Sequence, residues 1–226
     1  MRHLFSVCVL LAVVPAMCDA ATLQKQVEEA GKSGKYTYVM FYRHSDNATK
    51  LMEETIRSHV AETAEKTTWV SVNVNDRNEA ELLKRFDASR IPLPTVFGVA
   101  PNGAVTGVYR QKVNSEQLQK SILTPMYSEV VMALQSQQVA VISLMPSREA
   151  SVPTGVMELE KNAAFKGKLH FVTAYSTDQS EAELFRRMKV DQNLSEPVVL
   201  MFAPPGVYLG TFQSTVAGHK LAQTLH

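Results

Sequence analysis

The chain has 226 residues, of which 20% are charged and 45% hydrophobic, with 23 basic and 22 acidic residues and a formal net charge of +1. This length holds one large domain or two domains of about 100 residues each. Because both signs of charge are interleaved along the chain, the composition excludes the basic surface of a nucleic-acid-binding protein, a polybasic membrane-binding patch and the acidic excess of a high-capacity calcium store.

The N-terminus is typical of a targeting segment. A short basic start precedes an apolar run over residues 4–14, which has the length of a signal-peptide core and is too short to span a bilayer. Cleavage after Ala20 is the first choice and cleavage after Ala16 is an alternative; in a third interpretation, Cys18 is lipidated and anchors the chain. We therefore expect residues 1–20 to be a signal peptide and the rest to be periplasmic or secreted, without a transmembrane segment.

The cysteine count limits the chemistry that the protein can perform. The only two cysteines are Cys8 and Cys18, and both fall within the targeting segment. A chain that begins at Ala21 would have no thiol for a disulfide, a metal site or nucleophilic catalysis. We therefore expect its folded part to depend on hydrophobic packing alone.

The first half alternates strand-like and helix-like patterns. Strands are predicted over residues 36–43, 69–74, 95–100 and 104–110. Helices are predicted over residues 23–31, 46–65, 79–86 and 114–123. Pro101, Asn102 and Gly103 predict a hairpin turn, because Asn-Gly favours the tight turns that join two strands. Asn114 and Gln117 have the spacing of a capping box at the start of the last helix.

The second half repeats this order of elements. Strands are predicted over residues 139–145, 169–176, 198–203 and 207–213. Helices are predicted over residues 127–134, 153–164, 181–188 and 216–226. Pro204, Pro205 and Gly206 predict the second hairpin turn.

A repeated sequence indicates that the two halves are copies of one unit. Residues 79–85 read EAELLKR and residues 181–187 read EAELFRR, so the offset is 181 − 79 = 102 residues. At the same offset, Val39 falls on Val141 and the patterns on both sides match. Chance similarity between two amphipathic helices does not explain matched strands, so we interpret the chain as a duplication.

The order β-α-β-α-β-β-α in each half resembles the thioredoxin fold. The likeness is carried by the strand VMFYR before a long helix, and by the segments RFDASRIPLPTVFGVAPNGAV and RRMKVDQNLSEPVVLMFAPPGV. The resemblance implies the α/β class, with two tandem α/β/α sandwiches over residues 21–125 and 126–226 and a central mixed sheet in each.

The resemblance also implies a groove beside a cis proline that precedes the hairpin. Pro94, followed by Thr95, and Pro197, followed by Val198, match that proline, and here the offset slips to 197 − 94 = 103. Pro92 is the alternative in the first copy. Because this groove accepts extended polypeptide in the family, the resemblance implies a peptide-binding groove at these residues.

The family's Cys-x-x-Cys motif lies where the first strand turns into the long helix, whose N-terminus stabilises a thiolate. We call the four residues at this position the slot, and it contains no sulfur in either copy. Its residues are Asp46, Asn47, Ala48 and Thr49 in the first copy and Arg148, Glu149, Ala150 and Ser151 in the second. The buried acid of the family falls on Met40 and Ile142, which are both apolar. Dithiol–disulfide exchange requires a thiolate, so we expect none from this chain.

Other candidate groups have structural interpretations. Asp46 is placed to cap the long helix, because a carboxylate there accepts backbone N–H bonds. Ser151 is expected at the start of the corresponding second helix, without an evident base beside it. His44 lacks neighbours for metal binding or acid–base work. We therefore predict no catalytic residue, no metal and no cofactor.

The sequence thus predicts an exported, redox-inactive pair of thioredoxin-like domains that bind a protein or an extended peptide. The role would be that of an adaptor, scaffold or chaperone-like module, similar to the non-catalytic domains of protein disulfide isomerases. Two alternatives stay open. One is a thioredoxin-family oxidoreductase, or a glutathione- or peroxide-linked enzyme, that acts without its own cysteines. The other is a structural envelope component anchored through Cys18.

Overall fold

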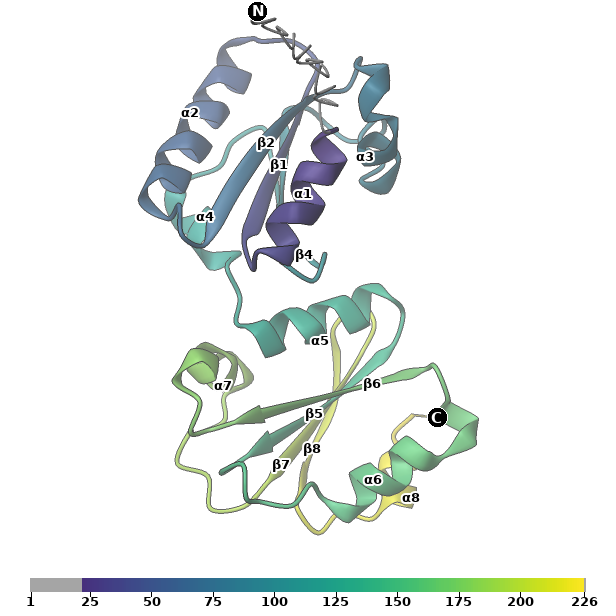
Figure 1. The fold of residues 1–226 in the computed structure, drawn as a ribbon. Helices are drawn as coiled ribbons and strands as arrows, with labels where there is room; N and C mark the ends of the chain where they lie inside the picture. Colours follow the sequence, from purple (N-terminus) through teal and green to yellow (C-terminus); the bar gives the residue numbers. More distant parts are fainter. Residues whose placement is uncertain (1–21, 226) are drawn as a thin grey trace, which may run out of the picture.

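The computed structural model describes residues 22–225 (Figure 1). The predicted signal peptide, with Cys8 and Cys18, lies outside the described residues. The described part of the chain forms two mixed α/β domains, each with its own four-stranded sheet. No helix between residues 22 and 225 is both long and apolar enough to cross a membrane.

The sheet of the first domain mixes parallel and antiparallel pairs. Its strands are β1 (Tyr36–Tyr42), β2 (Thr67–Asn73), β3 (Thr95–Val99) and β4 (Val105–Arg110). They lie in the order β2-β1-β3-β4, where β1 runs parallel to β2 and antiparallel to β3, and β4 is antiparallel to β3. The central strand β1 is buried along almost its whole length, which explains its continuous apolar sequence.

Helices cover both faces of this sheet (Figure 1). They are α1 (Leu23–Lys32), α2 (Asn47–Glu62), α3 (Ala80–Arg85) and α4 (Ser115–Lys120), and a short 3-10 turn over Arg77–Glu79 precedes α3. Because side chains alternate along a strand, Phe41 packs with α1 and α3 whereas Met40 packs with α2 and α4. The capping box of Asn114 and Gln117 at the start of α4 is confirmed.

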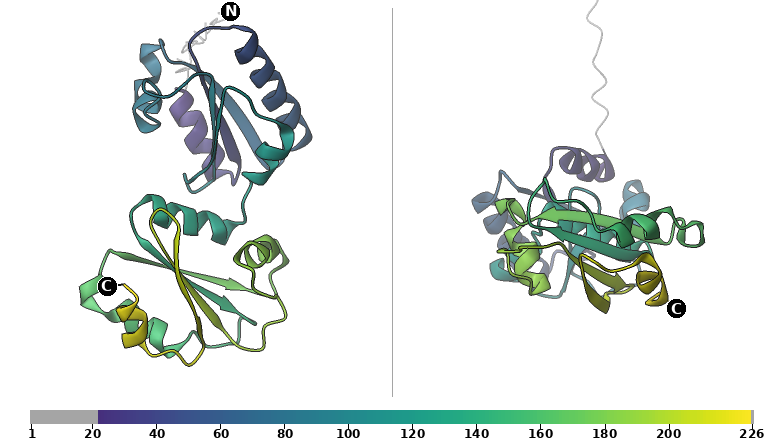
Figure 2. Two further views of the ribbon diagram at one scale, coloured as in Figure 1. Left: turned by 180° about the vertical axis from the view of Figure 1, so that it is seen from behind. Right: turned by 90° about the horizontal axis from the view of Figure 1, so that it is seen from below.

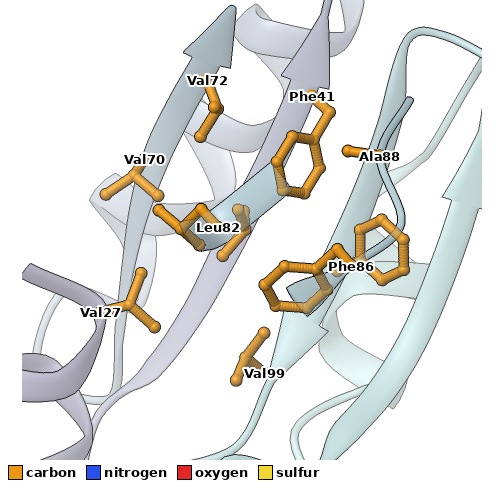
Figure 3. Close-up of a cluster of buried hydrophobic side chains, with 10 residues drawn as sticks. Val27, Phe41, Val70, Val72, Leu82, Phe86, Ala88 and Val99 are labelled. Atoms are coloured by element: carbon orange, nitrogen blue, oxygen red, sulfur yellow. The ribbon is translucent and has the colours of Figure 1, made fainter. Parts of the chain in front are cut away.

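An aromatic cluster forms the centre of the core on the α1 and α3 face (Figure 3). The ring of Phe41 lies 5.5 Å from that of Phe86 and 5.7 Å from that of Phe97, and the last two are 4.8 Å apart. Leu82, from the repeated sequence, is buried against these rings. Large apolar side chains of this kind supply most of the burial that stabilises a domain without disulfides.

The second domain repeats the topology (Figures 1 and 2). Its strands are β5 (Val139–Met145), β6 (Leu169–Tyr175), β7 (Val198–Ala203) and β8 (Val207–Gln213), in the order β6-β5-β7-β8. Its helices are α5 (Pro125–Gln135), α6 (Thr154–Lys161), α7 (Ala182–Met188) and α8 (Gly218–Gln223), with 3-10 turns over Ala163–Phe165 and Gln179–Glu181. The predicted α/β architecture, with a central mixed sheet in each half, is confirmed.

Most predicted boundaries agree with the structure within a few residues, and two of the differing helix ends have a clear local cause. The helix predicted over 114–123 stops at Lys120, and the Ser121 hydroxyl donates to the carbonyl of Leu118. The helix predicted from residue 127 begins at Pro125, because the Thr124 side chain caps it and proline suits the first helical turn. The expected division at 125/126 therefore falls within the first turn of α5.

Strand pairing corrects the alignment of the two copies by one residue in β1 and β5. Val39 pairs with Val70, and Ile142 pairs with Val172, which lies 172 − 70 = 102 residues after Val70. Val39 therefore corresponds to Ile142, and the predicted match with Val141 is wrong. The cause is length: 66 − 42 = 24 residues separate β1 from β2, but only 168 − 145 = 23 separate β5 from β6.

The repeated sequence has a structural role at its first glutamate. The Oε1 atom of Glu79 accepts a hydrogen bond from the backbone N–H of Leu23 at 3.2 Å, and that of Glu181 accepts one from Met126 N–H at 3.0 Å. Both carboxyl groups are buried. Each glutamate thus ties the N-terminus of the first helix of its domain to the repeated segment.

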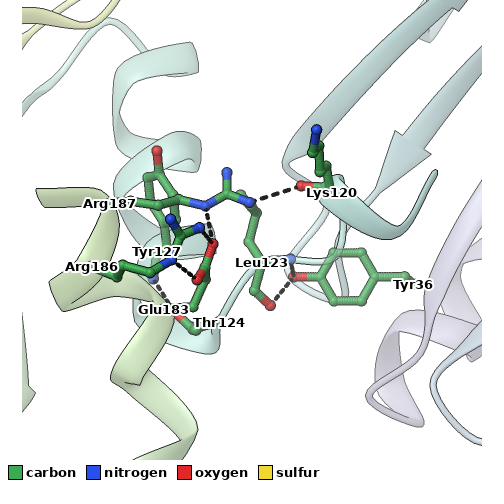
Figure 4. Close-up of polar contacts among 8 residues, drawn as sticks. All are labelled: Tyr36, Lys120, Leu123, Thr124, Tyr127, Glu183, Arg186 and Arg187. Carbon is green, nitrogen blue, oxygen red and sulfur yellow. Dashed lines mark hydrogen bonds and ion pairs between the residues drawn. The ribbon is translucent and has the colours of Figure 1, made fainter. Parts of the chain in front are cut away.

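The two domains contact each other through α5. Tyr36, at the start of β1, donates its hydroxyl to the carbonyl of Leu123 at 2.9 Å (Figure 4). The same hydroxyl lies 2.7 Å from the Ser128 hydroxyl. The side-chain amide of Gln135 bonds both backbone groups of Val105, at 3.0 and 2.7 Å. Apolar side chains fill the space between them: Tyr36, Ala100, Ala104, Ile122, Val131 and Met132.

Hydrogen bonds made by Arg187 add to this contact between the domains. Arg187 of α7 donates to the backbone carbonyl of Lys120 in the first domain at 3.1 Å, and to the carboxylate of Glu183 at 2.7 Å (Figure 4). Arg186 also bonds Glu183, and these two arginines lower the pKa of Glu183 to about 2. The second copy of the repeated sequence therefore carries a domain–domain contact.

Candidate functional site

The slot of the first domain begins α2. Asp46 is the N-cap residue, and its Oδ1 atom accepts a hydrogen bond from the backbone N–H of Thr49 at 2.8 Å. This backbone bond lowers the pKa of Asp46. The predicted capping role of Asp46 is therefore confirmed.

The other slot residues also serve the start of the helix. Asn47 and Ala48 are the exposed first residues of α2. Thr49 is buried, and its hydroxyl donates to the backbone carbonyl of His44 at 2.8 Å. The polar groups of the slot thus hold the turn between β1 and α2.

A small hollow of about 290 Å³ joins this slot to the loop before β3. The Leu93–Pro94 peptide bond in that loop is cis, and the buried Thr95 donates its hydroxyl to the carbonyl of Pro92. The structure therefore brings Asp46, Thr49 and Pro94 to one place. The lining residues are Arg43, His44, Asp46, Thr49, Ile91, Pro92, Leu93 and Pro94.

In the second domain, the equivalent of Met40 is Ser143. Met40 pairs with Val96 and Ser143 pairs with Val199, and 199 − 96 = 103 is the offset between the two hairpins. The predicted match of Met40 with Ile142 is therefore wrong, because β1 and β5 align at an offset of 103 residues and not 102. A buried hydroxyl, and not an apolar side chain, stands where the family has its acid.

The helix that follows the second slot starts later than its counterpart. α6 begins at Thr154, so a loop of 152 − 145 = 7 residues follows β5, against 45 − 42 = 3 residues between β1 and the Asp46 cap. Pro153 disfavours helical geometry at Val152, which prevents α6 from extending backwards. The expectation that Ser151 lies at a helix start is therefore wrong.

Arg148 of this loop points toward the end of β6. Its guanidinium lies 4.9 Å from the centre of the Tyr175 ring and 4.0 Å from the carboxylate of Asp178. These contacts are a cation–π stack and a long, exposed ion pair. Arg148 thus connects the loop after β5 to the end of β6.

The remaining loop residues have local roles. The backbone N–H of Glu149 donates to the Ser147 hydroxyl at 3.3 Å, and hydrogen bonding by Ser147 lowers the pKa of Glu149. Ala150 is half-buried and Ser151 is exposed. The second slot is therefore a surface turn.

The predicted cis proline at Pro197 is wrong. The cis peptide bonds among residues 22–225 are Leu93–Pro94 and Pro204–Pro205, and the second lies in the turn between β7 and β8. Thr95 holds the loop of the first domain through its hydroxyl, but Val198 stands in its place in the second domain and has no hydroxyl to donate. Within residues 22–225, a hollow beside a cis proline at the predicted position therefore occurs in the first domain, at Pro94.

The sequence did not reveal a hollow of about 1030 Å³ on the second domain, between α5, α7 and the β7–β8 hairpin. Tyr208 at its edge is 55% exposed and its ring lies 5.6 Å from that of Phe202. Val207 beside it is 53% exposed. Most lining side chains are aliphatic or aromatic: Tyr127, Val130, Val131, Leu134, Met188, Leu200, Phe202, Pro205 and Tyr208.

A glycine in one copy and a leucine in the other explain why this hollow is open. The corresponding hollow of the first domain is about 400 Å³, since α1 lies against the hairpin turn there. A Cβ atom on Gly31 would come within 2.7 Å of the Pro101 carbonyl oxygen. Ala30 and Ala133 accept equivalent hydrogen bonds at the ends of α1 and α5, so Leu134 stands at the position of Gly31. Aligning the copies at an offset of 133 − 30 = 103 would have exposed this difference.

A further hollow of about 780 Å³ lies between the two domains. The buried hydroxyls of Tyr36 and Ser128 at its wall already bond each other and the linker. These groups stabilise the contact between the domains.

The histidines do not form a metal site in the described part of the chain. No group of three or more His, Asp or Glu residues between 22 and 225 could hold a metal ion. The buried His59 lies 3.2 Å from the Tyr38 hydroxyl and 3.0 Å from the Ser115 hydroxyl, and burial lowers its pKa. It is a hydrogen-bonded core residue.

No family model and no curated protein matches this chain. Several solved structures are similar. The first two thioredoxin domains of Saccharomyces cerevisiae Eps1p are 12% identical, with a TM-score of 0.31, over 93% of this chain and 98% of that one. Human ERp44 in form II is 12% identical, with a TM-score of 0.41, over 96% of this chain and 61% of that one.

A single-domain protein is also similar. The germline-specific thioredoxin Deadhead from Drosophila melanogaster is 18% identical, with a TM-score of 0.35, over 46% of this chain and 93% of that one. These similarities concern the fold alone.

Proposed function

We propose that this tandem pair of thioredoxin-like domains is an exported, redox-inactive protein that binds polypeptide segments as an adaptor or chaperone-like module. The observation that carries the proposal is the apolar hollow of about 1030 Å³ on the second domain. Concave, mostly apolar surfaces of this size are typical of ligand sites.

The outer edge of the hollow favours a polypeptide over a small buried ligand. Tyr208 is half-exposed on the edge strand β8, and Phe202 continues the apolar surface inward. Exposed apolar side chains gathered beside a hollow are typical of protein-binding surfaces. Tyrosine is among the residues that contribute most to such contacts.

The redox-inactive part of the proposal rests on the two slots. Asp46 and Thr49 hold the start of α2, and Arg148 and Glu149 hold a surface turn, so none of them replaces a thiolate. An insulin-disulfide reduction assay tests this part. We expect no turnover above that of buffer, and turnover that persists in the chain without Cys8 and Cys18 would contradict it.

The binding part is tested with a reduced and alkylated, fluorescently labelled model polypeptide. We expect Tyr208→Ala to weaken binding about fivefold, since tyrosine is enriched among the interface side chains whose truncation costs more than about 1 kcal/mol. Leu51→Ala is the matched control, because Leu51 is equally exposed but lies on α2 of the first domain. Equal affinity of the wild type and Tyr208→Ala would contradict the assignment of binding to this hollow.

The exported part is tested by N-terminal mass spectrometry of the protein after expression in a secreting host. Cleavage after Ala20 would give a chain that begins at Ala21. Recovery of the uncleaved chain inside the cell would contradict export, and a lipid mass on Cys18 would support the anchored alternative.

A further inference from the structure

We infer that the hollow of the second domain recognises polypeptide segments in which an acidic side chain lies beside apolar ones. This inference rests on the proposed polypeptide-binding function and names the chemistry of the segment that is bound. It is carried by the charges around the hollow and by how they differ between the two domains.

The hollow has basic but no acidic residues in its lining. Arg187 and Lys189 stand at the end of α7, and no Asp or Glu lines the hollow. The remaining polar lining groups, such as Gln135 and Thr211, are uncharged. A surface of this kind favours a partner with apolar side chains and a negative charge.

The guanidinium of Arg187 already has partners within the protein. Its guanidinium bonds the Glu183 carboxylate and the Lys120 carbonyl, and it lies 5.4 Å from the centre of the Tyr127 ring. These partners hold Arg187 in place (Figure 4), and it lines the hollow there. The cation available to a ligand is therefore Lys189.

Lys189 is placed to supply that charge. It ends α7 in the left-handed conformation, with a φ of 57°, and it is exposed at the rim. Within residues 22–225 its side chain takes part in no ion pair. A ligand carboxylate beside the apolar wall can therefore pair with it.

The first domain has the opposite charge at this position. Asp87 lies 189 − 87 = 102 residues before Lys189, also has a positive φ of 47°, and pairs with Arg90 at 3.7 Å. The smaller hollow of that domain is lined by Glu28 as well as by basic residues. Of these two hollows, only that of the second domain combines an apolar wall with charged lining residues that are all basic.

The test uses synthetic peptides that are identical except at one position, which is Asp, Asn or Lys between Leu and Phe. We expect the Asp peptide to bind the full chain about two- to fivefold more tightly than the Asn peptide, because an exposed ion pair contributes modestly. The Lys peptide should bind most weakly. The differences should shrink in high salt, which screens exposed charges.

Variants of Lys189 localise the effect. Lys189→Gln should abolish the preference for the Asp peptide, and Lys189→Asp, which copies the first domain, should reverse it. Lys25→Gln, at an exposed position on α1, is the matched control and should leave the preference unchanged. The urea midpoint of each variant shows that it is folded.

The outcomes separate the two proposals. If no peptide binds, the proposed polypeptide-binding function fails. If all peptides bind equally and Lys189→Gln changes nothing, the function stands and the acidic preference is overturned. If the peptide-free protein is a dimer that Lys189→Gln dissociates, a second copy occupies the hollow and the inference is also overturned.

Discussion

The two domains have the same sheet order but differ where the first helix meets the hairpin. In the first domain, Gly31 lets α1 approach the turn, and Ala104 is fully buried under α5. In the second domain, Leu134 and the half-exposed Val207 stand at these positions. This end of the first domain thus contacts α5, whereas the same end of the second domain is exposed. A few side chains produce this difference on the same sheet order.

The helix after the redox slot differs as well. α2 has 16 residues and begins with the Asp46 cap, whereas α6 has 8 residues and no side-chain cap. Neither slot contains a cysteine, so neither has to present a thiolate at a helix N-terminus.

The largest expected effect tests whether the two cores are equivalent. Leu82 and Leu184 occupy the same position of the repeated sequence, and both are fully buried. Leu82→Ala and Leu184→Ala should each lower the free energy of unfolding by about 2–5 kcal/mol, because each leaves a cavity. Urea denaturation followed by circular dichroism measures both, with the exposed Leu51→Ala as the control. A small loss for only one of them would mean that the cores are not equivalent.

An intermediate effect is expected when the first domain is made to resemble the second. Gly31→Leu places a side chain against the Pro101 carbonyl and should cost about 1–3 kcal/mol through overpacking. Lys25→Leu adds the same side chain at an exposed site of α1 and should have little effect. Urea midpoints compare the two variants. Equal stability would show that the glycine does not control how closely α1 and the turn approach.

The smallest effect concerns pH and the buried glutamate of the second copy. Burial raises the pKa of Glu181 above its ordinary value of 4.5, so ionisation is less favourable in the folded state. Its contribution to stability is fully present below pH 4.5 and is lost as the pH rises through the folded pKa. The free energy of unfolding of the wild type should therefore fall over this window relative to Glu181→Gln.

Urea denaturation at a series of pH values measures this difference. Glu160→Gln, on the exposed side of α6, is the control and should follow the wild type. A constant difference between the wild type and Glu181→Gln across the window would contradict the assignment.

Much of the fold could be predicted because its signals are local. The apolar centre of β1, the Asn102-Gly103 turn and the Asp46 cap each depend on residues next to one another in the chain. The slot of the second domain could be predicted less well. The sequence predicts the start of α6 within one residue, at Pro153, but the slot is placed by an offset of 102 residues, which takes no account of the seven-residue loop after β5.

The sequence by itself determined the duplicated α/β framework, the two slots without cysteine and the local caps, because hydrophobic periodicity and neighbouring residues decide them. Only the tertiary structure decided the one-residue shift between the copies, the cis bond at Pro94 but not at Pro197, and the hollow beside Leu134. These features depend on how segments far apart in the chain approach each other. Gly31 and Pro101, for example, are 101 − 31 = 70 residues apart, yet the missing side chain of one determines how closely the other can lie.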